Sequence, residues 1–268
     1  MHLKRIIAAL VLTPLFLLLI IKGSYVHYSM LVVVLASLGL WEYFNLIGKS
    51  VDRRLRNIGI LWGVLLAGSF HVGSSQVIIA MLALGFISVC LVRLSKAGDL
   101  GTVFQEIGYT FLGPLYVSLL LGHLSLIRST LEGREWTLLL FFSIWMGDIA
   151  AFYTGLSIGK HKLYPEISPN KTIEGAIGGT LGCFIVVTAA KVFYMNQLSV
   201  VDVAVLSIGI AVMGQLGDLC ESMFKRAAGV KDSGNIIPGH GGILDRFDSV
   251  LFAAPFLYYY LVFIKGID

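Results

Sequence analysis

Charged residues are scarce in this chain of 268 residues, in which Lys, Arg, Asp and Glu together make up only 13%. Hydrophobic residues make up 57%, and the mean hydropathy is +0.85. Such a composition is too apolar for a water-soluble domain. The sequence therefore predicts an all-α, polytopic integral membrane protein. The net charge of +4 gives no reason to expect a nucleic-acid partner.

Cysteine is rare as well. Cys90, Cys183 and Cys220 are far apart in the sequence, which argues against a disulfide framework or a thiolate metal site. The chain also lacks the P-loop of ATPases, the Gly-x-Ser-x-Gly of serine hydrolases and the His-Glu-x-x-His of zinc proteases. No internal repeat and no low-complexity linker divides it, so we expect one membrane-embedded domain over residues 1–268.

Apolar runs near the length of about 20 residues that crosses a bilayer are the main feature of the sequence. No small-x-small cleavage site follows the first run, so we interpret it as a retained helix. About nine transmembrane helices are predicted, at residues 5–22, 25–47, 57–72, 76–94, 106–127, 136–158, 173–194, 200–222 and 248–265.

Positive residues are distributed unevenly between the alternate loops that nine spans would create. With the N-terminus in the cytoplasm, fifteen of the 20 Lys and Arg residues fall on the cytoplasmic side and five on the other. Cytoplasmic loops of membrane proteins are enriched in Lys and Arg. The bias predicts a cytoplasmic N-terminus, and it places the polar motifs described below on the cytoplasmic face. The membrane itself is expected to be the cell inner (plasma) membrane.

One stretch, residues 217–248, concentrates both signs of charge together with glycine. Hydrocarbon does not solvate charges, so these groups face water, a ligand or each other. If residues 217–227 are helical, five polar side chains share one face. They are Asp218, Glu221, Ser222, Lys225 and Arg226. Asp245 and Asp248 repeat the i, i+3 spacing where the next apolar run begins, so a second helix would offer two more carboxylates.

Residues 238–242, Pro-Gly-His-Gly-Gly, separate the two predicted helices. Glycines permit positive φ and let backbone N–H groups approach an anion closely. Carboxylates, cations and a glycine-rich turn together suit Mg²⁺ and a polyphosphate, because Mg²⁺ takes one or two carboxylates and fills its coordination sphere with water and phosphate oxygens. The alternative is a salt-bridged cytoplasmic loop between two membrane helices.

The motif residues resemble a known family. The pattern Ser222-x-x-Lys225-Arg226, then Lys231-Asp232-Ser233-Gly234, then Pro238-x-His240-Gly241-Gly242-x-x-Asp245-Arg246-x-Asp248 resembles the signature of phosphatidate cytidylyltransferases (CDP-diacylglycerol synthases). Residues 168–175, Ser-Pro-Asn-Lys-Thr-Ile-Glu-Gly, are similar to the family's second motif. The first 140 residues match only in being apolar helices. The resemblance implies a catalytic segment at about 144–248.

The same resemblance implies the reaction: CTP and phosphatidate give CDP-diacylglycerol and pyrophosphate. The expected cofactor is Mg²⁺, and whether a second cation takes part is left open. Combined with the helical phasing, it implies the site residues. The expected metal ligands are Asp218, Asp245, Asp148 and Glu221. The expected catalytic residues are Asp218, Asp245, Lys225, Arg226, Lys231 and Asp248. The expected substrate-binding residues are Ser168, Asn170, Lys171, Thr172, Ser222, His240, Gly241, Gly242 and Arg246.

Asp148 lies well within the sixth apolar run, where a charge is costly, so an intramembrane acid is by default a functional candidate. The alternative is a structural carboxylate buried against a neighbouring helix. Lys171 stands near the start of the seventh helix, where the dipole disfavours a cation unless an anion binds there. Ser168 and Asn170 are candidate caps of that helix. Alternatively, Glu174 completes a capping box and Lys171 is merely solvated.

Glu42, in Trp41-Glu42-Tyr43-Phe44, is interpreted as an interfacial residue in an aromatic belt. Two other functions are weighed against the cytidylyltransferase. One is another CTP-dependent lipid enzyme, a polyprenol kinase or an archaeal lipid cytidylyltransferase. The other is a cation transporter, which would place polar residues at mid-membrane in several helices, whereas here they gather at the predicted cytoplasmic ends. Small residues at 178–182 suit close helix packing within one chain or in a homodimer.

Overall fold

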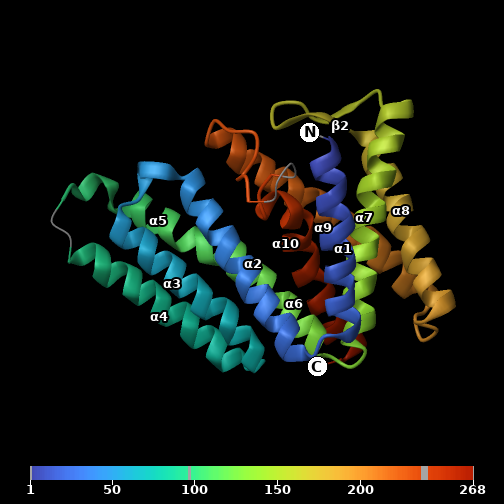
Figure 1. The fold of residues 1–268 in the computed structure, drawn as a ribbon, viewed down its shortest axis with the longest axis horizontal. Helices are drawn as coiled ribbons and strands as arrows, with labels where there is room; N and C mark the ends of the chain where they lie inside the picture. Colours follow the sequence, from blue (N-terminus) through green and yellow to red (C-terminus); the bar gives the residue numbers. More distant parts are fainter. Residues whose placement is uncertain (1, 96–97, 237–240, 268) are drawn as a thin grey trace. The chain divides into compact units, whose positions relative to one another are not determined.

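The protein is described by a computed structural model that covers residues 2–95, 98–236 and 241–267. Within these ranges it is built almost entirely of helices (Figure 1). The α-helices are α1 (His2–Lys22), α2 (Tyr25–Leu46), α3 (Arg53–Ser69), α4 (Ser75–Leu94), α5 (Val103–Gly113), α6 (Leu120–Ser129), α7 (Gly133–Ile158), α8 (Ile173–Phe193), α9 (Val200–Ala227) and α10 (Leu244–Tyr260). Shorter helical segments are Gly48–Ser50, Phe70–Val72, Leu100–Thr102, Pro114–Leu119 and Leu261–Lys265. The all-α prediction is confirmed.

The helices form two compact units, the first comprising Met1–Ser129 with Asp232–Arg246 and the second Thr130–Lys231 with Phe247–Asp268. In the first unit α3 packs against α2 and α4, and α2 packs against α6. Glycines permit this packing: a Cβ added at Gly63 would lie 2.4 Å from Leu40 Cδ1. Trp62 donates a 2.8 Å hydrogen bond to the Met81 carbonyl. Together these contacts bury one face of each helix.

In the second unit α7 packs along α8, and α8 packs against α9 (Figure 1). A Cβ at Gly182 would lie 2.8 Å from the Met146 carbonyl oxygen, and one at Gly178 would lie 2.3 Å from Thr154 Oγ1. Such close approach requires small residues. The small residues of 178–182 therefore serve helix packing within the chain.

Eight helical segments of the described residues are long and apolar enough to cross a bilayer. They are Tyr25–Leu46, Arg53–Val72, Ser75–Leu94, Leu100–Ser129, Gly133–Ile158, Ile173–Phe193, Val200–Ala227 and Leu244–Lys265. The polytopic membrane architecture is thus confirmed. The first predicted span coincides with α1, in which Thr13–Lys22 is a shorter apolar helix. The count of nine and the orientation of the N-terminus stay predictions.

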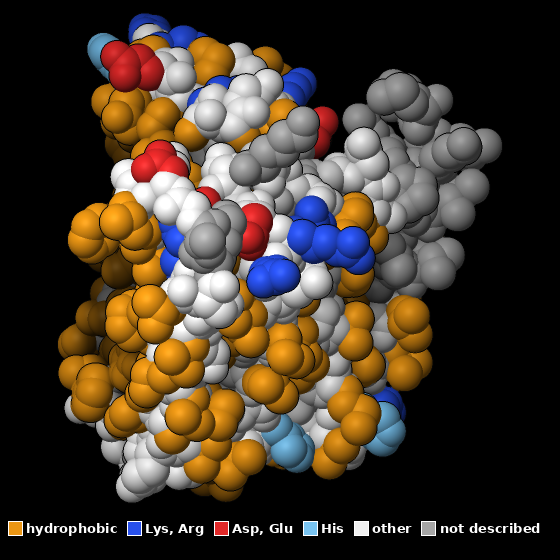
Figure 2. Space-filling model, turned by 90° about the vertical axis from the view of Figure 1, so that its left-hand side faces the viewer, with side chains coloured by type: hydrophobic (Ala, Val, Ile, Leu, Met, Phe, Trp, Pro, Cys, Tyr) orange, Lys and Arg blue, Asp and Glu red, His pale blue; other side chains and the backbone are white. Residues whose placement is uncertain are grey.

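Apolar side chains cover much of the molecular surface, as expected for a protein in contact with lipid. Figure 2 shows one face, on which hydrophobic side chains fill the lower part and most acidic and basic side chains in view lie above them. Several large side chains are strongly exposed: Phe104 is 91% exposed, Phe193 81% and Leu156 74%. Exposing such large apolar side chains to water is unfavourable, whereas exposing them to lipid hydrocarbon is not.

The basic segment before α8 is a β-hairpin. Strand β1 (Lys162–Tyr164) pairs antiparallel with β2 (Ser168–Thr172), and Lys162 is opposite Thr172. Ser168, Asn170 and Lys171 thus lie in a strand. The helix cap is Thr172, whose Oγ1 accepts a 3.0 Å hydrogen bond from the Gly175 N–H. The expectation that Ser168 or Asn170 caps α8 was wrong, because both precede the cap position.

Candidate active site

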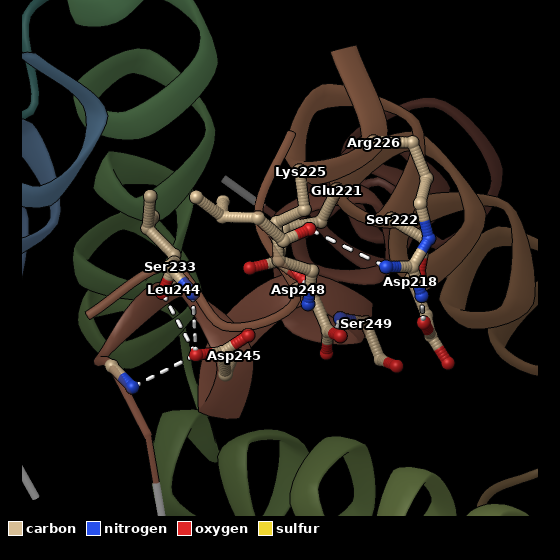
Figure 3. Close-up of polar contacts among 12 residues, drawn as sticks. Asp218, Glu221, Ser222, Lys225, Arg226, Ser233, Leu244, Asp245, Asp248 and Ser249 are labelled. Carbon is tan, nitrogen blue, oxygen red and sulfur yellow. Dashed lines mark hydrogen bonds and ion pairs between the residues drawn. The ribbon is translucent and has the colours of Figure 1, made fainter. Parts of the chain in front are cut away.

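The polar face predicted on residues 217–227 belongs to the last turns of α9, which continues to Ala227. Figure 3 shows Asp218, Glu221, Ser222, Lys225 and Arg226 projecting from this helix. Glu221 is 1% exposed and forms an ion pair with Lys225, which is 9% exposed. Ser222 Oγ lies 3.3 Å from Asp218 Oδ1 and donates to it. For residues 217–227 the alternative of a salt-bridged loop is wrong, because these side chains lie on a helix.

Lys171 brings the upstream motif to this face. Its Nζ lies 2.5 Å from Asp218 Oδ2, so β2 and α9 are joined by an ion pair within the second unit. The two side chains are 26% and 32% exposed, although the Lys171 Nζ atom itself is buried. The idea that Lys171 is merely solvated was wrong, because a carboxylate is its partner.

Glu174 is not part of a capping box. Its Oε2 accepts hydrogen bonds of 3.1 Å from the Lys160 N–H and 3.2 Å from the His161 N–H, and its Oε1 lies 2.6 Å from His161 Nδ1. Glu174 therefore fixes the chain that enters β1 against the first turn of α8. The side chain that caps α8 is that of Thr172.

Asp248 adds a further carboxylate from α10, and the negative charges of Asp218, Glu221 and Asp148 all act on it. Its Oδ1 accepts a 2.6 Å hydrogen bond from the Ser249 N–H. Gly217 lets α10 come this close to α9, because a Cβ there would lie 2.4 Å from the Asp248 carbonyl oxygen. Asp148 is exposed on α7, which contradicts the alternative of a buried structural carboxylate. The second unit thus gathers four carboxylates and two lysines.

Asp245 lies in the first unit, at the start of α10, and its Oδ2 accepts three hydrogen bonds (Figure 3). The donors are the Ser233 N–H at 2.9 Å, the Ser233 hydroxyl at 2.9 Å and the Gly242 N–H at 2.8 Å. Gly241 has φ +87°, which confirms the positive φ expected of this turn. The Lys231–Gly234 and glycine-rich motifs are therefore tied together by the Asp245 side chain.

Glu42 also belongs to this group, and the sequence interpretation of it was wrong. Its side chain is 0% exposed, and its neighbours Tyr43 and Phe44 are 3% and 1% exposed, so Glu42 is not at an interface, although Trp41 is 47% exposed. The Glu42 carboxylate accepts 2.9 Å hydrogen bonds from the Ile243 and Leu244 N–H groups. A carboxylate in an apolar run was the only signal in the sequence, and its partners lie about 200 positions further along the chain.

Most of the remaining predicted residues are exposed. Arg226 is exposed, and its guanidinium donates 3.3 Å hydrogen bonds to the carbonyl oxygens of Ile167 and Val230. Lys231, Asn170 and Arg246 are exposed, and Ser168 is half-buried. His240 lies outside the described residues. The assignment of all these side chains to substrate or catalysis stays a prediction.

The chemistry of the α9 group fits Mg²⁺ with a polyphosphate. Its donors are carboxylate and hydroxyl oxygens, and Mg²⁺ bound to nucleotides takes only one or two protein carboxylates. Within the described ranges no group of three or more His, Cys, Asp or Glu side chains is close enough to form a metal cage. Asp218, with Ser222 beside it, is a candidate to hold such an ion, and Lys171 and Lys225 are candidates to bind phosphate oxygens.

The fold and these groups define a class: a polytopic membrane protein whose carboxylates and lysines gather at helix ends. Residues 3–264 match the model of the Cytidylyltransferase family. The chain belongs to that family. It is 34% identical over 265 residues to a phosphatidate cytidylyltransferase of Bacillus subtilis (strain 168), with 96% of this chain and 97% of the relative covered. The phosphatidate cytidylyltransferase of Staphylococcus aureus (strain COL) is 35% identical over 260 residues, covering 94% of this chain and 96% of the relative.

Proposed function

We propose that this membrane protein is a phosphatidate cytidylyltransferase, which makes CDP-diacylglycerol and pyrophosphate from CTP and phosphatidate. The observation that carries the proposal is the ion pair between Lys171 and Asp218, because it joins the two sequence motifs in one group. The likeness to relatives named for this activity extends over nearly the whole chain. No feature favours the polyprenol kinase.

In the proposed reaction a phosphate oxygen of phosphatidate attacks the α-phosphorus of CTP. A new P–O bond forms, the bond from the α-phosphorus to the bridging oxygen breaks, and pyrophosphate leaves with its electrons. Phosphatidate is already anionic near neutral pH, so the step needs charge neutralisation and alignment more than a strong base. Mg²⁺, when bound, supplies positive charge to the phosphates.

The residues of the second unit have distinct parts in this proposal. Asp218 holds the metal, and Glu221, Asp248 and Asp148 are nearby carboxylates that orient it or bind a second cation. Lys171 and Lys225, which pair with carboxylates, bind the phosphate oxygens of CTP and neutralise the leaving pyrophosphate. Asp245 as a second ligand of the metal is part of the proposal. So is the placement of the active site on the cytoplasmic face of the inner membrane, where CTP is available.

The test is to incubate detergent-purified protein with CTP, phosphatidate and Mg²⁺, and to measure pyrophosphate and CDP-lipid. We expect both products only when both substrates are present, and no products when a chelator replaces Mg²⁺. Asp218→Asn should lower the rate by about 100-fold or more. Glu166→Gln, a change at an exposed carboxylate of the β-hairpin, is the control. CDP released only with a polyprenol acceptor would instead identify a kinase.

A further inference from the structure

Glu42 is a buried carboxylate that the proposed chemistry does not use. It lies in the last turns of α2, with a 0% exposed side chain. Its Oε1 accepts from the Ile243 N–H, and its Oε2 accepts from the Leu244 N–H, both at 2.9 Å. Ser233 Oγ donates to Oε2 at 3.3 Å. Burying a carboxylate is costly unless it is hydrogen-bonded, so these contacts account for its presence there.

The N–H groups that donate hydrogen bonds to Glu42 lie at the start of α10. The first N–H groups of a helix have no partner within the helix, and a negative charge there is favourable. A nearby Ser, Thr, Asp or Asn usually serves as the acceptor. Here the acceptor for Ile243 and Leu244 comes from α2. Glu42 therefore fixes the position of the helix turn that carries Asp245.

Two motif glycines are required by the Glu42 carboxylate. A Cβ added at Gly242 would lie 2.5 Å from Glu42 Oε1 and 2.2 Å from Ser233 Oγ. A Cβ added at Gly234 would lie 2.6 Å from Glu42 Oε1. These distances are too short for real contacts, and both segments would have to move. The glycines of the motif thus make room for a carboxylate of the protein itself.

The contacts of Glu42 and of Asp245 share the same two motif segments. Ser233 Oγ lies 3.3 Å from Glu42 Oε2 and 2.9 Å from Asp245 Oδ2, and its single proton serves one carboxylate at a time. The Gly242 N–H donates to Asp245, and the next two N–H groups donate to Glu42. Any shift of one carboxylate therefore changes the hydrogen bonds of the other.

We propose that Glu42 is a positioning residue, whose carboxylate holds Ser233 and the Gly242–Leu244 turn and thereby fixes the Asp245 side chain. The inference rests on the proposed function for its catalytic part and on the geometry alone for its structural part. It extends the functional machinery to α2, far upstream of the signature motifs.

The structural part is tested by hydrogen exchange of the purified full-length protein. Glu42→Gln keeps the shape of the side chain but replaces one acceptor oxygen by an NH₂ that faces a donor. We expect the Ile243 and Leu244 amides to exchange about 10-fold faster in this variant, without a change in the middle of α9. Tyr43→Phe is the matched control, because it removes a part-buried hydrogen bond of α2 to the Tyr109 carbonyl and should leave these amides unchanged. Unchanged exchange in Glu42→Gln would overturn the proposal.

The catalytic part is tested by kinetics in the same preparations. Glu42→Gln should raise the Mg²⁺ concentration for half-maximal rate several-fold, whereas a mere loss of folded protein lowers only the maximum rate. If Glu42 acts through Asp245, the Glu42→Gln substitution should lower the rate of the otherwise wild-type protein. The same substitution should have no further effect on the rate of Asp245→Asn. Faster exchange with unaltered kinetics would overturn the positioning role. A wild-type protein without cytidylyltransferase activity would overturn the proposed function, while the exchange result still decides the structural part.

Discussion

Lys171 in β2 and Asp218 in α9 form an ion pair, with 2.5 Å between Nζ and Oδ2. A carboxylate next to an ammonium group can bind a metal-bound triphosphate, because the carboxylate binds the metal ion and the lysine binds the phosphate oxygens. The pair thus defines where we expect CTP to bind in the second unit. Substitution of Lys171 also allows its contribution to catalysis to be measured separately from its contribution to stability.

Replacing Lys171 by Met should lower the cytidylyltransferase rate by about 100-fold, because a cation that binds phosphate is lost. The ion pair is partly exposed, so its contribution to the free energy of unfolding is at most about 1 kcal/mol. We therefore expect little change in the melting temperature in detergent. Lys162→Met, at an exposed lysine of the same hairpin, is the control for charge. A large loss of stability with normal specific activity would contradict this assignment.

The buried pair of Glu221 and Lys225 should behave differently. Both side chains are almost inaccessible, and removing one partner of such a pair leaves an uncompensated charge, at a cost of about 3–5 kcal/mol. Glu221→Gln and Lys225→Met should each lower the melting temperature strongly. The double variant should recover part of the loss, yet remain inactive because Lys225 is absent. Additive losses in thermal unfolding would show that the two charges do not compensate one another.

Two glycine-to-alanine changes in helices should have opposite signs. At Gly182 a Cβ would lie 2.8 Å from the backbone oxygen of Met146, so α7 and α8 must separate. We expect Gly182→Ala to destabilise the protein by about 1–3 kcal/mol. At Gly108, in α5, a Cβ would meet nothing within 4 Å, and Gly108→Ala should stabilise by about 0.5–1 kcal/mol. Thermal unfolding in detergent measures the stability of both variants. Equal effects would mean that the α7–α8 contact is looser than described.

The predicted orientation can be read from cysteine labelling on the two sides of α8. The variants Glu166→Cys and Asn196→Cys, made after replacement of Cys90, Cys183 and Cys220, place a thiol at exposed positions before and after this helix. A membrane-impermeant maleimide should label position 166 from the cytoplasmic side and position 196 from the opposite side. Inverted and right-side-out vesicles provide the two sides. The reverse pattern would contradict a cytoplasmic N-terminus together with nine spans.

Several features follow from the sequence alone, because they depend on local properties. Hydropathy and length predicted the membrane helices, and the polytopic architecture is confirmed. The i, i+3 and i+4 spacing predicted the shared face of Asp218, Glu221 and Lys225, and α9 confirms it. Helical periodicity is a property of neighbouring residues, so no tertiary information was required. The motif residues also predicted the family to which the chain belongs.

Other features depend on contacts between distant parts of the chain. The β-hairpin depends on the pairing of β1 with β2, and no strand was predicted there. Glu42 looked like an interfacial residue, because nothing near it in the sequence reveals the N–H groups of Ile243 and Leu244 that it accepts from. A buried carboxylate is tolerated only where donors converge on it. Local sequence therefore determined the helices and their polar faces, and the tertiary structure decided which charges are paired and which helix start Glu42 stabilises.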